Sequence, residues 1–360
     1  MKKSCLSEKL FAIPLVALAL SCGVVPAQTF QVGSLQVPPG QTRSGFLAVP
    51  SGPDGQTQIP VTIINGVAPG PALAVIAGIH GYEYPPVLAA QRLAASITPP
   101  KLRGRVIIVQ VANMPSFLKR TVYYSPIDGQ NLNRVFPGKK DGTISQRIAF
   151  VITKEVIEHV DYLVDMHCGD GNESLRPYSY WMPIGNPKVD EPAREMAMVF
   201  GLDHIVIDRG RPKDPNASMY CSNTAMTRGK PALTIESGGV GVASDESEIS
   251  LIEQGVQNLM RHLKMADGKV EPPAKLTWYD PTEVFYFPTA LQDKAGLFYP
   301  KVKKMQMVEK GTLLGVVTDF FGKQIYELRA PFAGEVLYVI STPPISAGEP
   351  LAFIGAIKAN

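Results

Sequence analysis

Short apolar runs alternate with longer amphipathic segments from about residue 30 to residue 263. The apolar runs have the length of buried strands, and the segments between them carry apolar residues at helical spacing. We expect strands at Ala72–Ala77, Val106–Val111, Tyr162–Met166 and Ala232–Ile235, and helices at Glu83–Ser96, Ser145–Glu158 and Asp190–Phe200. This alternation predicts an α/β fold in which helices flank a mostly parallel mixed sheet on both faces.

The chain changes character near residue 270. Lys269–Lys275 includes Val-Glu-Pro-Pro-Ala, which is typical of a linker, and the segments after it are β-rich and broken by Gly and Pro. Two half-repeats in this part suggest a small hairpin barrel of the biotinyl/lipoyl type, although Lys323 lacks the sequence context of a modified lysine. We therefore predict an α/β domain at residues 28–270 and a smaller all-β domain, barrel-like or sandwich-like, at residues 271–360.

The first 27 residues have the pattern of an export signal. Lys2 and Lys3 precede an apolar run at Leu10–Leu20, and small residues end the segment at Ala27. The run is about half of the roughly 20 residues that a membrane-spanning helix requires, so we predict no membrane span. The expected location is periplasmic or secreted, with a lipoprotein attached through Cys22 as the alternative.

Composition excludes several classes of protein. Lys and Arg total 35 against 32 Asp and Glu, a net charge of +3 without long blocks of one sign, so we expect no nucleic-acid partner. Four cysteines in 360 residues are too few for a disulfide scaffold. Removal of the signal would leave Cys168 and Cys221, and the sequence leaves their pairing open.

Three of the predicted strands end beside potential metal ligands. The first is followed by His80-Gly-Tyr-Glu83, the third by His167 and the fourth by Glu236. Ligands bind at the carboxyl ends of strands in open α/β sheets, so these side chains are expected to converge. Two histidines and a glutamate are a ligand set of catalytic zinc sites. The alternative for His80 and Glu83 is a capped helix start, at which the negative charge of Glu83 is favourable.

Four segments together carry a resemblance to a known family. They are Gly78-Ile-His-Gly-Tyr-Glu83, Asn131-Leu-Asn-Arg-Val-Phe-Pro-Gly138, Asp165-Met-His167 and Thr234-Ile-Glu-Ser-Gly-Gly239. In this order they resemble the succinylglutamate desuccinylase/aspartoacylase family of the zinc carboxypeptidase superfamily. The resemblance implies a zinc carboxypeptidase-like catalytic domain at residues 28–270 and one zinc ion per chain. It also implies metal ligands at His80, Glu83 and His167, a general base at Glu236, and substrate-carboxylate binding by Asn133 and Arg134.

The sequence departs from the family pattern near the Asn-Arg pair. Aspartoacylase-like members have an Asp two residues before the pair, where this chain has Asn131, and an Arg shortly upstream that is missing here. Arg120 is the nearest candidate for the cation that stabilises the oxyanion, and Arg176 is a second candidate for reaching the substrate. Asp165 lies two residues before His167 and would therefore be on the same strand face, where it can orient the imidazole.

These observations predict a zinc-dependent hydrolase that cleaves the amide bond of an N-acylated amino acid or a related small carboxylate. The alternative within the same chemistry is a zinc carboxypeptidase acting on peptides, including cell-wall peptides, because the superfamily shares its machinery. The alternative from another class is a non-catalytic, metal-containing binding protein. The expected partner is a small-molecule substrate in the first case.

Overall fold

The computed structural model describes residues 28–239, 246–280, 284–285, 291 and 293–356. The predicted export signal at residues 1–27 lies outside this range. No helix within the described residues is long and apolar enough to cross a membrane.

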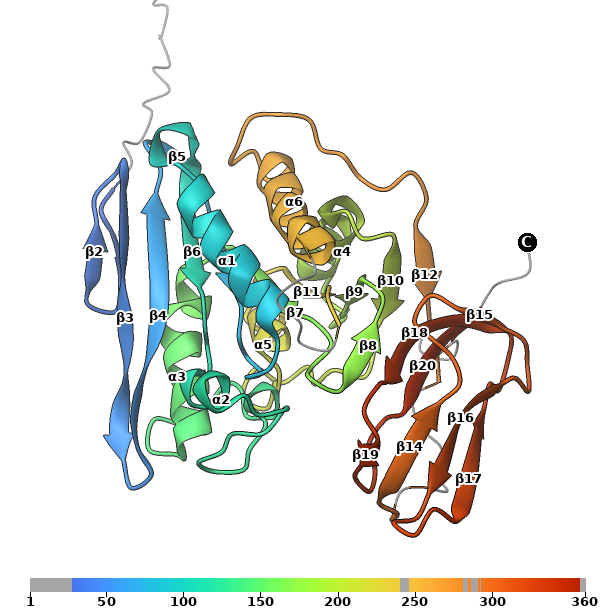
Figure 1. The fold of residues 1–360 in the computed structure, drawn as a ribbon. Coiled ribbons are helices and arrows are strands. Elements are labelled where there is room, and N and C mark those ends of the chain that lie inside the picture. The colour runs from blue at the N-terminus through green and yellow to red at the C-terminus, as the bar shows by residue number, and fades with distance from the viewer. Residues whose placement is uncertain (1–27, 240–245, 281–283, 286–290, 292, 357–360) are drawn as a thin grey trace, which may run out of the picture.

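A nine-stranded mixed sheet forms the centre of the larger domain (Figure 1). Its strands, in spatial order, are β12 (Thr277–Tyr279), β10 (His204–Ile207), β9 (Tyr178–Trp181), β11 (Ala232–Glu236), β7 (Tyr162–His167), β5 (Ala68–Ile76), β6 (Arg103–Val109), β4 (Gly55–Asn65) and β3 (Gln41–Gly52). The predicted fold class is confirmed, since β11, β7, β5 and β6 run parallel to one another through the middle of the sheet.

Antiparallel strands extend the sheet on both sides of this parallel centre. On one side, the long hairpin of β3 and β4 adds to β6, and on the other β9 runs antiparallel to β11. The sequence did not indicate the hairpin. Most side chains of β3 are exposed, as expected for an edge strand that packs on one face only, and it therefore lacks an apolar run.

Helices cover both faces of the sheet, and two apolar clusters fill the space between. Helices α1 (Tyr84–Ser96), α4 (Pro187–Phe200) and α6 (Glu246–His262) contribute to one cluster. Helices α3 (Ile144–Glu155) and α5 (Cys221–Thr227) contribute to the other, together with the small hairpin of β1 (Phe30–Val32) and β2 (Leu35–Val37). The three predicted helices are present with their bounds shifted by a few residues.

The C-terminal part is built from two antiparallel sheets. One contains β13 (Val284–Phe285), β20 (Ala352–Ala356), β18 (Gly334–Ile340) and β15 (Met307–Val308); the other contains β17 (Gln324–Arg329), β16 (Leu313–Thr318), β14 (Gly296–Pro300) and β19 (Pro344–Ile345). This arrangement fits the expected all-β domain, and Figure 1 shows it beside the end of the large sheet.

Strands are exchanged between the two parts. β8 (Glu173–Leu175) belongs to the segment that follows His167, yet it pairs with β18 of the C-terminal sheet. Conversely, β12 follows the predicted boundary at residue 270 but pairs with β10 at the edge of the large sheet. The C-terminal domain is therefore attached directly to the segment that follows a predicted metal ligand.

Candidate metal centre

The strand order brings the predicted ligands to one edge of the sheet. β5, β7 and β11 are neighbours and parallel, so their carboxyl ends lie side by side. His167 ends β7 and is in register with Glu236 at the end of β11, while His80 follows β5 after a short turn. The convergence that the sequence predicted for these residues is present in the structure.

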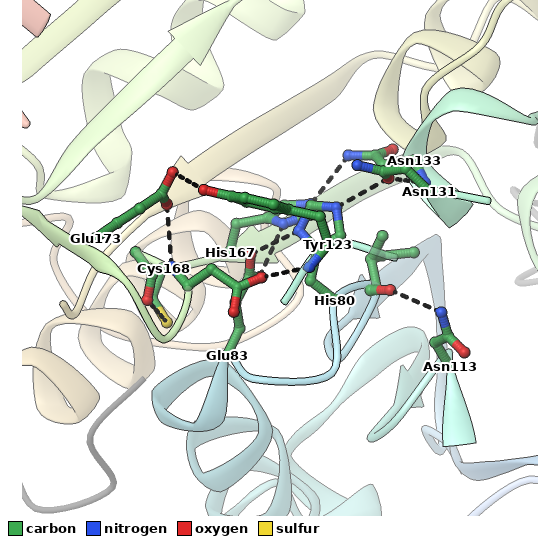
Figure 2. A network of polar contacts seen from close by, with 12 residues as sticks. His80, Glu83, Asn113, Tyr123, Asn131, Asn133, His167, Cys168 and Glu173 are labelled. Carbon is green, nitrogen blue, oxygen red and sulfur yellow. Dashed lines mark hydrogen bonds and ion pairs between the residues drawn. The ribbon is translucent and has the colours of Figure 1, made fainter. Parts of the chain in front are cut away.

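His80, Glu83 and His167 form a buried group whose ligand atoms all lie within 4.8 Å of one another. The carboxylate of Glu83 lies between the two imidazoles, with Oε1 2.6 Å from His80 Nδ1 and Oε2 2.9 Å from His167 Nδ1 (Figure 2). Burial alone would raise the pKa of Glu83, but the two histidines lower it to about 2. Glu83 is thus held as an anion between two nitrogen ligands.

The turn that carries His80 and Glu83 requires close backbone packing. Gly78 has a left-handed conformation, with φ of +70°, and a Cβ atom on Gly81 would lie 2.3 Å from the carbonyl group of Ser116. Glu83 occupies the position before the first turn of α1, yet its side chain makes no capping hydrogen bond there. The carboxylate is used by the histidines, so the capping alternative for Glu83 is not what the structure shows.

A second layer of oxygen atoms orients both imidazoles. His167 Nε2 lies 3.1 Å from Oδ1 of the fully buried Asp165, and His80 Nε2 lies 3.1 Å from Asn131 Oδ1. When the imidazoles are neutral, acceptor oxygens at both Nε2 positions favour the tautomers that carry the proton there, and both Nδ1 lone pairs then point toward Glu83. Two lone pairs and a carboxylate facing one another are stable around a cation, and a zinc ion fits this donor set.

Asn133 and Arg134 lie beside this group on a short 3₁₀ turn (Leu132–Arg134). The buried Asn133 places Nδ2 3.4 Å from His167 Nε2, and its Oδ1 accepts a hydrogen bond of 2.9 Å from the Cys221 backbone. Arg134 is exposed, and within the described residues its guanidinium forms no ion pair with a carboxylate. Asn133 is therefore fixed against His167, a predicted metal ligand, whereas Arg134 has no carboxylate partner among the described residues.

Glu236 is partly buried at the end of β11, next to His167 on β7. Burial raises the pKa of Glu236 well above its ordinary value. The nearby carboxylates of Glu83 and Glu173 raise it further, whereas the charge of His167 lowers it. A carboxylate whose proton affinity is raised beside a metal-ligand group is suited to accept and release a proton.

Three further polar residues lie around the ligands and were not indicated by the sequence. Tyr123 places its ring edge-on to His80, with ring centroids 5.8 Å apart, and its hydroxyl donates to Glu173. Its backbone N–H donates to Asp170 over 3.0 Å. Burial raises the pKa of Asp170 to about 6 and that of Glu173 to about 7. The only signal in the sequence is that both acids closely follow His167.

Neither of the two arginines proposed from the sequence forms a hydrogen bond or ion pair with His80, Glu83 or His167. Arg120 is exposed just after helix α2 (Met114–Lys119), and its side chain makes no hydrogen bond or ion pair with any described residue. Arg176 is buried and directs its guanidinium to Asp203 at 2.7 Å and to Glu335 at 2.5 Å. A buried guanidinium must be paired, and these two partners pair that of Arg176. Arg176 therefore joins the α/β part to the C-terminal sheet and does not contact the predicted metal ligands.

The two cysteines that would remain in the mature chain are both buried free thiols. Cys168 donates to the carbonyl group of the following residue, Gly169, and burial raises its pKa well above the ordinary value. Both thiols therefore pack in the interior and are not joined in a disulfide.

Comparison with known proteins identifies the family. Residues 69–263, more than half of the chain, match the succinylglutamate desuccinylase/aspartoacylase catalytic domain, and the chain belongs to this family of amide hydrolases. It is 30% identical over 237 residues to N-alpha-acetyl-L-2,4-diaminobutyric acid deacetylase of Halomonas elongata, covering 64% of this chain and 67% of that protein.

Solved structures agree with this assignment. A succinylglutamate desuccinylase from Silicibacter sp. TM1040 superposes with a TM-score of 0.77 at 26% identity, covering 93% of this chain and 99% of that one. The product-bound ectoine utilization protein EutE (DoeB) from Ruegeria pomeroyi gives a TM-score of 0.77 at 27% identity, with the same coverage. The family expected from the four sequence segments is confirmed.

Proposed function

We propose that the protein is a zinc-dependent deacylase that hydrolyses the amide bond of an N-acylated amino acid. The observation that carries the proposal is the buried group of His80, Glu83 and His167, placed at the carboxyl ends of neighbouring strands in a chain of this family. One zinc ion per chain would be held by the Nδ1 atoms of the two histidines and the carboxylate of Glu83.

The residues around the metal would divide the chemistry between them. When bound, zinc supplies a Lewis acid that polarises the scissile carbonyl and lowers the pKa of water to about 7. Glu236 removes a proton from the attacking water and delivers it to the amine nitrogen as the C–N bond breaks, which yields a carboxylate and a free amine. General acid–base catalysis of this kind typically contributes 10²–10⁴-fold to the rate.

Asn133 and Arg134 would fix the other end of the substrate. The guanidinium of Arg134 presents several donors in a planar fork and has no carboxylate partner among the described residues, so a substrate carboxylate supplies the missing charge. The names of two relatives refer to succinylglutamate and Nα-acetyl-2,4-diaminobutyrate. Both compounds are N-acylated amino acids with free carboxylates.

The position of the C-terminal domain favours a small substrate over a peptide. Strand β18 pairs with β8 directly after the segment that carries Asp170, and Asn172 Nδ2 donates to Glu349 over 2.8 Å. These contacts tie the β-rich domain to the segment that follows His167. We expect the domain to limit the length of the acyl amino acid at this place, whereas a peptidase requires an open groove.

We further propose that the enzyme acts outside the cytoplasm. The support is the pattern of residues 1–27, with two lysines, an apolar run and small residues before Ala27. N-terminal sequencing of the protein from the periplasmic fraction of an expression host should begin at Gln28; an unprocessed Met1 in the cytoplasm would contradict the proposal.

Hydrolysis of a defined panel tests the proposed function. Protein stripped with a chelator and reloaded with one equivalent of zinc is offered N-acetyl and N-succinyl amino acids, including Nα-acetyl-L-2,4-diaminobutyrate, and unmodified peptides. We expect release of amino acid from acylated compounds only. Glu236→Gln should lose at least about 100-fold in kcat while it still binds zinc. Stoichiometric zinc without hydrolysis of any compound would instead support the binding-protein alternative.

A further inference from the structure

We propose that Arg211 is a second carboxylate-binding residue, which acts with Arg134 to select substrates that carry a free carboxylate. This inference rests on the proposed function, because it concerns how the same site recognises its substrate. Arg211 lies between β10 and α5, in a segment that the sequence motifs did not include.

Both arginines pack against one aromatic ring. The guanidinium carbon of Arg134 lies 4.6 Å from the ring centroid of Tyr220, and that of Arg211 lies 3.6 Å from the same centroid. The residue after Tyr220 donates its backbone N–H to Asn133, the amide that lies against His167. Tyr220 thus places two cations at the border of the metal centre.

Arg211 keeps most of its hydrogen-bond donors free. Its Nε donates to Asp208 Oδ2 over 2.5 Å, whereas Nη1 and Nη2 make no hydrogen bond within the described residues. The side chain is only 14% exposed, so these terminal donors are held in a partly buried position. Within the same residues Arg134 uses only Nη1, which donates to the carbonyl of Asn133. Two guanidinium groups with free N–H groups provide the geometry that a carboxylate accepts.

The balance of charge points to an anionic ligand at this place. Asp208 compensates Arg211, but no carboxylate compensates Arg134 among the described residues, and two guanidinium groups at one ring repel each other. A substrate carboxylate bound beside them would compensate this excess positive charge. The acidic residues Glu83 and Glu236 lie at the metal end of the site, so repulsion from them favours binding with the carboxylate at the arginines and the acyl group at the metal.

Two substrates that differ only in the carboxylate distinguish carboxylate binding by Arg211 from a structural role. Zinc-loaded wild type, Arg211→Gln and Arg209→Gln are compared on Nα-acetyl-L-2,4-diaminobutyrate and on its carboxamide. Arg209 is the matched control because it is two residues away, 55% exposed and paired with Asp280. We expect Arg211→Gln to raise KM for the carboxylate by roughly 10- to 100-fold, with kcat and the carboxamide KM nearly unchanged.

The control variant should keep the wild-type preference for the carboxylate. Arg211→Lys retains the charge but lacks the planar fork, so it should give an intermediate KM. This variant keeps the role of Arg211 testable if the glutamine variant misfolds. An unchanged ratio between the two substrates in Arg211→Gln, or an equal loss on both, overturns the role of Arg211. If the wild type hydrolyses neither compound and no member of the panel, the result contradicts the proposed function and, with it, this inference.

Discussion

At the scale of single residues, the proposed metal centre depends on which nitrogen of each histidine is free. Asp165 and Asn131 provide oxygen atoms at the Nε2 positions of His167 and His80, so that both Nδ1 atoms face Glu83. A carboxylate polarises an imidazole more strongly than an amide does. His167, which is oriented by Asp165, should therefore be the stronger of the two nitrogen ligands.

Asp165→Asn should weaken zinc binding by roughly 10- to 100-fold, since the imidazole of His167 loses its anionic partner. Competition against a chromogenic chelator measures this change in the dissociation constant. Asp161→Asn is the control, because Asp161 binds the backbone of Ala72 at the opposite end of β7. Equal zinc affinity in wild type and Asp165→Asn would show that the carboxylate does not support the ligand.

At the scale of elements, the decisive feature is the turn between β5 and α1. Its seven residues, 77–83, bring His80 and Glu83 back over the sheet, with Gly81 packed against the backbone of α2 at Ser116. Since this contact leaves no space for a side chain, the position of the ligands depends on the path of the backbone.

Gly81→Ala should lower the free energy of unfolding by about 1–3 kcal/mol, because the added Cβ atom would force two backbone segments apart. Urea denaturation measures this loss, and zinc affinity should fall with it. Gly210→Ala serves as a control, because a Cβ atom added there would meet only the side chain of Asp208, at 3.4 Å. If Gly81→Ala matched wild type in both measurements, the turn would not be packed as described.

The sequence predicted those elements whose signal is local. Buried parallel strands such as β5 and β7 appear as apolar runs. His80 and Glu83 follow β5 after a short turn, and His167 ends β7. The exposed edge strand β3 has no such run, so it was not predicted. Arg176 and Tyr123 could not be assigned either, because their partners Glu335 and Glu173 are distant in the sequence and meet them only through folding.

At the scale of the whole molecule, the two domains are joined by shared strands and by a cluster of charges. Arg176, Asp203 and His204 belong to the α/β part, while Glu335 comes from β18 of the C-terminal sheet. The His204 hydrogen bond and the charge of Arg176 lower the pKa of Asp203 to about 2. Burial alone would lower the pKa of His204, but Asp203 and Glu335 raise it above 6.5.

These directions predict how stability changes with pH. The contribution of Asp203 is present above its ordinary pKa of 3.8 and is lost as the pH falls toward about 2. The contribution of His204 is complete below 6.5 and is lost as the pH rises through its raised pKa. Asp203→Asn should therefore be destabilised relative to wild type most clearly near pH 5, and urea unfolding should show the difference shrinking toward pH 2.5. A constant difference over this range would contradict the role of the cluster.

The central claim is that His80, Glu83 and His167 hold one zinc ion. Anomalous scattering from a crystal of the zinc-loaded protein, measured on both sides of the zinc absorption edge, tests it most directly. We predict a single peak in contact with His80 Nδ1, His167 Nδ1 and the carboxylate of Glu83. A peak bound by other residues, or none between these three side chains, would contradict it.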